Sequence, residues 1–328
     1  MAKKKGFKLT FNAILFLIWL FIFAGIATIS SAFLSPNYLI NVMLRNIIEI
    51  GMVALPMTLI IIMGGIDLSV GNIMVLASTL GGLASISLGS GPAILITLVT
   101  GLVCGLINGL VIVKAKISPM VTTLATMYLY LGISRGISKG SSIYSYDFAT
   151  FLGNTSLFGI PLQIWIYILL AVIFTVLLSK TTLGRKLYSI GLNENATRYA
   201  GIDVDKIKLF MYVLCGLICA LASFIWLGRF TSIKFDAGTN FNMKVITIVV
   251  LGGTSINGGI GSMAGTIIGT LIIATLNSGL TVMNIPIDVQ TIVQGSVLIV
   301  SLIAYAVVNS RAKKKKLIKI QAAPKQAA

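Results

Sequence analysis

Polar residues suited to handling a solute lie in one short segment between two strongly apolar runs. Residues 64–72 read Gly-Gly-Ile-Asp-Leu-Ser-Val-Gly-Asn, so Asp67, Ser69 and Asn72 supply a carboxylate, a hydroxyl and an amide. An ionisable side chain between membrane segments is costly, and proteins usually keep one for a hydrated cavity or a fixed partner. The segment therefore predicts a polar pathway or its gate, or else a cap in which Asp67 or Ser69 holds the next helix.

A further amide, Asn108, lies in an apolar run in which Gly101, Gly105 and Gly109 recur every fourth residue. Glycines at this spacing share one face of a helix and let a neighbouring helix approach closely. We expect this face to serve helix packing. Asn108 is a second candidate for the pathway or its gate.

The residue types argue against catalysis and metal binding. The chain has no histidine, which excludes Ser-His-Asp and Cys-His catalysis. Its eight carboxylates form no pair on one helix face of the kind that general acid-base chemistry needs. Cys104, Cys215 and Cys219 all lie in apolar runs, where we expect small core residues. The sequence thus predicts no enzyme activity, no cofactor and no metal site.

The elements that hold these residues must be membrane helices. With 57% hydrophobic and 10% charged residues in 328, and a mean hydropathy of +1.00, the chain has too little polar surface for a soluble globule. We predict an all-α polytopic membrane protein with about ten transmembrane helices, some broken or re-entrant. The expected spans are near 11–33, 40–63, 72–88, 92–113, 119–136, 162–179, 209–228, 244–257, 264–283 and 287–308.

The positive charge orients these spans. Four basic residues precede the first span, two lie at 114–116, six at 180–208 and seven from residue 311 onward. Because cytoplasmic loops carry an excess of Lys and Arg, this distribution predicts that both termini are cytoplasmic. We expect a basic N-terminus at 1–10, one transmembrane domain at 11–308 and a basic tail at 309–328. The net charge of +17 then reflects topology and anionic membrane lipid, and not nucleic acid.

The loop at 180–208 shows an ordered succession of caps and small residues. The run from Glu194 to Tyr199 predicts a short helix, with Asn193 as its cap and Gly201 as its terminator. A short helix between spans is suited to docking in a groove of a soluble partner; the alternative is an ordinary solvated loop. The candidate docking residues are Gly184, Arg185, Gly191, Asn193, Glu194, Ala196, Gly201 and Ile202.

Two weaker patterns complete the picture. Arg45 and Glu49 are four residues apart and could pair on one helix face, which favours a structural role over the alternative of a role in transport. Residues 61–71 are matched in outline by residues 249–259, each with a glycine pair at the end of an apolar run. This echo indicates either an internal duplication, as in many transporters, or a chance similarity of glycine-rich turns.

Four ordered motifs resemble those of the membrane subunits of ribose-type sugar ABC importers. That family includes arabinose, xylose, galactose, rhamnose and autoinducer-2 permeases, with nucleoside permeases as relatives. The similar stretches are 64–71, then 105–109 with 116–119, then 184–202, and finally 252–255 with 258–259. The resemblance extends over residues 38–308.

The resemblance implies a dimerising permease of the bacterial cytoplasmic membrane, working with a second copy or a paralogue. It would receive a sugar from an extracytoplasmic binding protein and be driven by a separate ABC ATPase. The chain itself lacks a Gly-x-x-x-x-Gly-Lys-Ser/Thr phosphate loop. By the same analogy, the 184–202 stretch is the element coupled to the ATPase. Asp67, Ser69, Asn72 and Asn108 are candidates for the substrate path or its gate.

One departure from the family pattern and three alternatives for the function stay open. Where many members of the family carry Glu-Leu-Asp, this chain has Asn242-Met243-Lys244, which bears on the solute, the binding protein and the choice between homodimer and heterodimer. The solute of a related permease, such as a nucleoside or autoinducer-2, is one alternative. An ion-coupled secondary transporter that uses Asp67 is another, and a membrane scaffold is a third.

Overall fold

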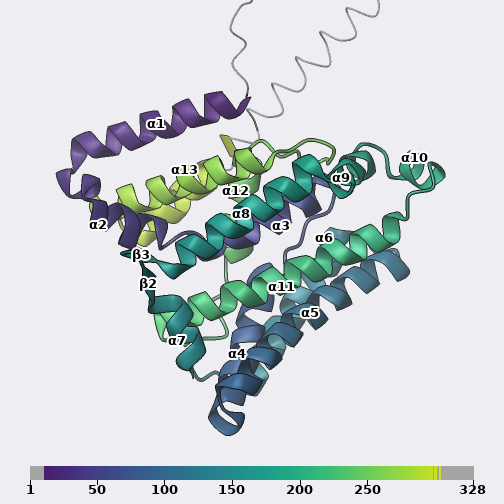
Figure 1. Ribbon diagram of the computed structural model, residues 1–328, viewed down its shortest axis with the longest axis horizontal. Helices are drawn as coiled ribbons and strands as arrows, with labels where there is room; N and C mark the ends of the chain where they lie inside the picture. Colours follow the sequence, from purple (N-terminus) through teal and green to yellow (C-terminus); the bar gives the residue numbers. More distant parts are fainter. Residues whose placement is uncertain (1–10, 298, 301–302, 304–328) are drawn as a thin grey trace, which may run out of the picture.

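The structure is a computed structural model that describes residues 11–297, 299–300 and 303. These residues are mostly helical, and the helices pack side by side in one bundle (Figure 1). The longer helices are α1 (Phe11–Ile29), α3 (Ile48–Ile62), α4 (Val70–Leu88), α5 (Ser90–Lys114), α6 (Pro119–Ser138), α8 (Leu162–Lys180), α11 (Val204–Phe230) and α13 (Met263–Val282). The shorter helical segments are η1 (Ser31–Leu34), α2 (Pro36–Tyr38), η2 (Leu39–Leu44), α7 (Asp147–Asn154), α9 (Thr182–Leu192), α10 (Glu194–Tyr199) and α12 (Phe241–Leu251).

The prediction of an all-α polytopic protein is confirmed. Six helices are long and apolar enough to cross a membrane: α1, α4, α5, α8, α11 and α13. A seventh span results if Pro36–Leu44 and Ile48–Ile62, which are bent by 55° at a short break, are counted together. The count of about ten stays a prediction. It needs α6, which is long but more polar, the 11-residue α12, and a span at 287–308 of which residues 298, 301–302 and 304–308 lie outside the described residues.

The break before α3 overturns the predicted pairing of Arg45 with Glu49. The segment η2 is a π-helix, and a turn at 45–47 removes Arg45 from the helical register of α3. Glu49 is fully buried and instead lies 2.9 Å from Nε of Arg229 on α11. Arg45 donates hydrogen bonds to the Gly153 carbonyl (2.7 Å) and to Oδ1 of Asn154 (2.8 Å), both at the end of α7. The two charges therefore tie α3 and the break to different helices.

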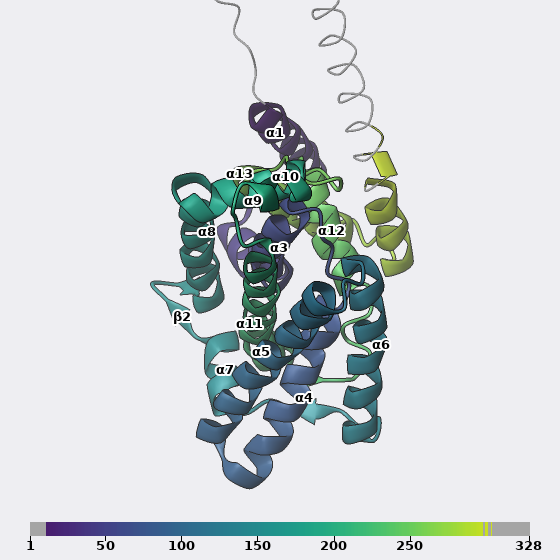
Figure 2. The ribbon, with the colours of Figure 1, turned by 90° about the vertical axis from the view of Figure 1, so that its right-hand side faces the viewer.

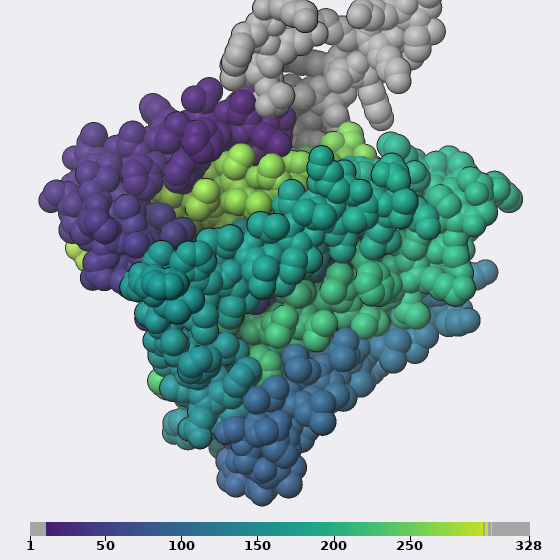
Figure 3. Space-filling view, viewed as in Figure 1, coloured from purple at the N-terminus to yellow at the C-terminus, as the bar shows by residue number. Residues whose placement is uncertain are grey.

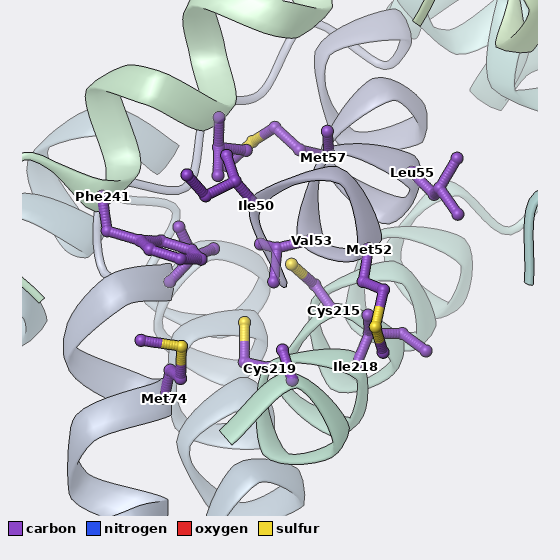
Figure 4. Packing of buried hydrophobic residues seen from close by; sticks show 14 of the residues in the cluster. Ile50, Met52, Val53, Leu55, Met57, Met74, Cys215, Ile218, Cys219 and Phe241 are labelled. Atoms are coloured by element: carbon purple, nitrogen blue, oxygen red, sulfur yellow. The ribbon is translucent and has the colours of Figure 1, made fainter. Parts of the chain in front are cut away.

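The core of the bundle is built around α3. Every residue of α3 is buried, and the helix contacts α8, α11, α12 and α13. Met52 and Val53 lie close to Cys215 of α11 (Figure 4). The three cysteines are free and buried, which confirms their expected place in the core. An apolar helix covered on all sides in this way is a central structural element.

The two ends of the bundle carry different short elements. At one end, β1 (Ile143–Tyr144) pairs with β4 (Ser232–Ile233) in antiparallel register, and β2 (Ser156–Leu157) pairs with β3 (Ile160–Pro161). These strands accompany α7, whereas α9 and α10 lie at the opposite end (Figures 1 and 2). We call these the α7 end and the α10 end. In the space-filling view α1 lies along the edge of the molecule, where it packs mainly on α13 (Figure 3).

The glycine face of α5 packs directly against α11, as the sequence predicted. A Cβ atom at Gly105 would meet the Tyr212 carbonyl, and one at Gly216 would lie 3.0 Å from the Gly105 Cα. The backbones of α5 and α11 are thus in contact, which only glycine at these positions permits. Asn108, on the same helix, is fully buried beside this crossing.

We expect Gly216→Val to destabilise the protein by about 1–3 kcal/mol, because the new side chain must push α5 and α11 apart. The matched control is Gly132→Val on α6, where no atom lies within 4 Å of an added Cβ. The unfolding midpoints of the purified variants in one detergent measure the difference. Equal midpoints for the two variants would show that the α5–α11 crossing tolerates a side chain.

Candidate functional site

The site begins where α3 stops inside the bundle. Gly64 adopts a left-handed conformation (φ +83°), its N–H donates to the Ile61 carbonyl (2.9 Å), and the Gly65 N–H donates to the Ile60 carbonyl (2.9 Å). This is the Schellman pattern that ends a helix and satisfies its last carbonyls. The chain then runs without helical structure until α4 begins at Val70.

The internal echo has a structural counterpart that is displaced by one residue. At the end of α12, Gly253 has φ +85° and donates to the Val250 carbonyl (2.9 Å), and the Thr254 N–H donates to the Val249 carbonyl (3.2 Å). Gly64 therefore corresponds to Gly253, whereas the sequence match aligned it with Gly252. Helices α3 and α12 thus end in the same way, and α6 and α13 share this ending at Lys139 and Asn284.

Three of the four predicted pathway residues form one buried network. Oδ1 of Asp67 accepts hydrogen bonds from the Ser69 backbone N–H (2.9 Å) and from the Ser69 hydroxyl (2.6 Å). The Asn108 amide donates to the Ser69 hydroxyl oxygen (2.8 Å), and the Tyr130 hydroxyl donates to Oδ1 of Asn108 (3.2 Å). The network thus joins the segment before α4 to α5 and α6. Asp67 accepts from the N–H of Ser69, the residue before α4, but neither Asp67 nor Ser69 accepts from an N–H of the first turn of α4, so the predicted side-chain cap is absent.

Asn72 lies elsewhere. Its amide donates to the Met127 backbone carbonyl of α6 (2.8 Å), and the Asn242 amide of α12 lies 3.6 Å from the Met127 sulfur. Sequence reasoning noted Asn242 only as a departure from a family pattern and did not place Met127 at all. The signal for Asn242 was an amide beside a lysine in a short apolar run. The four predicted pathway residues thus fall into two polar clusters, one around Asp67 and one around Asn72.

Both clusters are buried and shielded from solvent in this structure. Asp67, Ser69 and Asn108 are fully buried, and Asn72 is 8% exposed. Oδ2 of Asp67 has no hydrogen-bond partner among the described residues. A buried acceptor without a partner costs free energy, so the Asp67 cluster holds its segment less firmly than a fully bonded network would. Such an arrangement suits a gate that must open better than a permanently open lining.

At the α10 end, the predicted short helix is confirmed. Helix α10 spans Glu194–Tyr199, and Oδ1 of Asn193 accepts from the Ala196 N–H (3.0 Å). Gly201 (φ +81°) ends the helix with a Schellman pattern, in which Ile202 donates to the Thr197 carbonyl (3.3 Å). The stretch before it, expected to be loop, is an 11-residue helix, α9.

Ion pairs fasten α10 to the start of α11. Glu194 pairs with Arg198 (2.9 Å) and with Lys208 (2.6 Å), and Arg198 also pairs with Asp205. Partial burial opposes ionisation of Glu194, but hydrogen bonds from Lys208 and Arg198 outweigh it and lower the pKa of this carboxyl. Its contribution to stability is therefore present at neutral pH and is lost as the pH falls through that lowered pKa. Because Glu194 and Arg198 are 38% and 40% exposed, each pair contributes only about 0.2–1 kcal/mol.

The predicted docking glycines fasten α9 to the body of the protein. A Cβ atom at Gly191 would collide with the Ile62 carbonyl at the end of α3 and with the Gly259 N–H. The Gly259 N–H itself donates to the Ile62 carbonyl (2.8 Å), and the Tyr188 hydroxyl donates to the Gly261 carbonyl (2.7 Å). Gly184 is buried against the end of α8. These residues connect α9 to the α3 end and to the loop after α12.

The exposed surface of this end comes from other residues. Arg185, Asn193, Ala196 and Gly201 are exposed as predicted, and Glu194 and Ile202 are half-buried. The largest exposed apolar groups, however, are Tyr199 at 92% and Leu192 at 73%, which were not predicted. Large apolar side chains on an otherwise polar short helix were the signal that could have found them. A groove of about 510 Å³, lined by Lys116, Ser118, Glu194, Arg198 and Lys208 among others, lies beside α10.

Comparison with known proteins gives consistent matches over nearly the whole chain. Residues 38–302 match the family model described as "Branched-chain amino acid transport system / permease component". The chain is 40% identical to the ribose import permease protein RbsC of Bacillus subtilis (strain 168), covering 85% of this chain and 87% of the relative. It is 34% identical to the ribose import permease protein RbsC of Escherichia coli K12, covering 87% and 90%.

A third relative is named for a different solute. The autoinducer 2 import system permease protein LsrD of Photorhabdus luminescens is 34% identical, over 94% of this chain and 93% of the relative. No solved structure matches the chain significantly.

We expect Ser69→Ala to destabilise the protein by about 1–3 kcal/mol, because it leaves the buried Asn108 amide without its acceptor and takes a hydrogen bond from Asp67. Ser85→Ala, on the half-buried part of α4, removes only a bond to the Gly82 carbonyl of its own helix and is the control. Unfolding midpoints compare the two. If Ser69→Ala were as stable as the control, the Asp67 cluster would not hold its segment.

Proposed function

Because the chain belongs to the family of transport-system permease components, we propose that it is the membrane subunit of an ATP-driven importer for a monosaccharide or related polar solute, of ribose type. The observation that carries the proposal is the similarity to import permeases over more than four fifths of the chain. A helical bundle with the buried Asp67 and Asn72 clusters and a short exposed helix, α10, at one end supports it. Nucleoside and autoinducer-2 permeases are the nearest alternatives for the solute.

The physical requirement on the path is an exchange of hydrogen bonds. A sugar that leaves water loses the hydration of its hydroxyl groups, so the route must offer replacements without binding so tightly that release is slow. Amides and hydroxyls meet this requirement, and Asn72, Ser69, Asn108 and Asn242 supply them. In our proposal Asp67, Ser69 and Asn108 form the gate, and Asn72 with Asn242 contributes to the path.

Orientation and partners follow from the same proposal. The α10 end faces the cytoplasm, where a separate ABC ATPase binds Tyr199, Leu192 and the groove beside α10. The α7 end faces the extracytoplasmic binding protein, and a second copy of the chain or a paralogue completes the path. The protein is a multi-span permease, and we place it in the bacterial inner membrane with both termini in the cytoplasm and one transmembrane domain at 11–308.

The contacts of α9 suggest how ATPase motion reaches the gate. Gly191 lies against the Ile62 carbonyl, two residues before the Gly64 turn and five before Asp67. A displacement of α9 therefore acts on the backbone from which the gate segment begins. The ion pairs of Glu194 carry the same displacement into α11, whose Tyr212 hydroxyl lies against Gly65. Both connections converge on the short stretch between α3 and α4.

Reconstitution tests the proposal. Proteoliposomes that contain this chain with its ATPase and its binding protein should take up labelled ribose only when ATP is supplied. Uptake should persist when an uncoupler collapses the proton gradient. Uptake by liposomes that hold this chain alone, or uptake that the uncoupler abolishes, would instead support an ion-coupled transporter that uses Asp67.

Tyr199→Ala tests the docking surface. A buried interface tyrosine typically contributes about 2 kcal/mol, so the variant should bind the ATPase roughly thirtyfold more weakly. Tyr144→Ala, which removes an exposed tyrosine at the α7 end, is the matched control and should bind normally. Both affinities can be measured with the purified chain in nanodiscs. Equal affinities of Tyr199→Ala and the unchanged chain would move the ATPase contact away from α10.

A further inference from the structure

A small hairpin at the α7 end has an unusual turn. In the β2–β3 hairpin, Leu157 is opposite Ile160, and the turn residues Phe158 and Gly159 have φ of +54° and +75°. Positive φ at both central positions defines a type I′ turn, which normally takes Asn, Asp or Gly. A phenylalanine in this conformation costs of order 1–3 kcal/mol. Phe158 therefore occupies a backbone conformation that is unfavourable for phenylalanine.

The tip of this hairpin consists of exposed apolar side chains. Phe158 is 88% exposed and Leu157 is 46% exposed, and the hairpin projects from the helices beside it (Figure 2). Trp165, in the first turn of α8, donates its indole N–H to the Leu157 carbonyl (3.3 Å) and is itself 38% exposed. Phe151, on the preceding α7, is 53% exposed. A hydrogen bond from α8 thus holds the tip in place, and Trp165 and Phe151 are further exposed apolar side chains of this region.

The hairpin is continuous with the outer face of a membrane span. No charged residue occurs from 148 to 179, a stretch that includes the hairpin and almost all of α8. Along α8, Ile168, Leu169, Val172, Ile173 and Val176 are exposed, as expected for a helix that faces lipid. Trp is typical of the level at which such a helix meets the membrane surface. Trp165 therefore places the hairpin at that level.

We propose that the β2–β3 hairpin is a lipid anchor, whose Phe158 and Leu157 insert at the boundary between headgroups and acyl chains beside α8. This assignment gives the disfavoured phenylalanine a partner and extends the lipid-facing surface of α8 without a gap. It does not depend on which solute the protein carries.

The hairpin follows directly after α7, which packs closely on the rest of the bundle. Asn154, two residues before β2, donates to the Gly228 carbonyl of α11 (2.9 Å) and accepts from Arg45 (2.8 Å). A Cβ atom at Gly153 would collide with the Gly228 backbone, so α7 and α11 are in direct contact. The depth of the hairpin in the membrane therefore sets the depth at which α7, α11 and the break before α3 are held.

Nitroxide labelling measures this depth in the full chain. In nanodiscs, a label at Phe158→Cys should collide more often with oxygen, which concentrates in lipid, than with a nickel chelate, which stays in water. The three native cysteines are buried, so the introduced one takes the label. Leu169→Cys on the lipid face of α8 and Asp147→Cys, at the exposed charged start of α7, give the lipid and water references.

If the label at position 158 shows the same preference for oxygen over nickel as the label at Leu169→Cys, the result supports the lipid anchor. One that follows the Asp147 reference overturns it and shows a tip in water, free for a soluble protein. Phe158→Asn separates turn conformation from lipid contact, since asparagine suits the type I′ turn but lacks the apolar ring. In that background, a label at Leu157→Cys should become more accessible to nickel than in the unchanged hairpin. No change there would also contradict the proposal.

Discussion

A helix that stops inside a bilayer releases backbone groups, and each of these must find a partner within the protein. Much of this structure follows from that constraint at the end of α3. The Gly64 turn satisfies carbonyls of the last helical turn, and the Ile62 carbonyl, which the turn leaves free, accepts from the Gly259 N–H. The loop after α12 is thereby held on the α3 end, and α9 packs on both through Gly191.

Satisfying these groups brings distant parts of the chain to one place. The 64–69 segment, the 258–261 loop and the C-terminal part of α9 are far apart in sequence but meet around Ile62. Within this junction the Asp67 cluster contains an unbonded acceptor, and the Gly191 contact lies on α9, next to the exposed α10. The residues that satisfy the backbone at this junction are therefore the same ones through which we propose that motion reaches the gate.

The sequence predicted the features that local chemistry determines. Composition identified an all-α membrane protein, glycine spacing identified the packed face of α5, and the Asn193 and Gly201 signals located α10.

The predictions from sequence failed where tertiary geometry decides the outcome. Arg45 and Glu49 have a helical spacing, but a turn between them gives each another partner. Asn72 was grouped with Asp67 by proximity in sequence, although the start of α4 directs it to Met127. Gly191 was expected on the docking surface, but it lies against the Ile62 carbonyl of α3. Backbone contacts across the bundle leave no pattern in a single sequence, so the sequence could not predict this contact.

The buried pair of Glu49 and Arg229 has a mechanical consequence. Separating two buried opposite charges leaves each without compensation, a cost of several kcal/mol that small rearrangements do not recover. The pair joins the first turn of α3 to the last turn of α11, at the end of the bundle away from α9. The exposed ion pairs at the other end of α11 join it to α10 and not to α3. We therefore expect any relative movement of α3 and α11 to be smallest at Glu49.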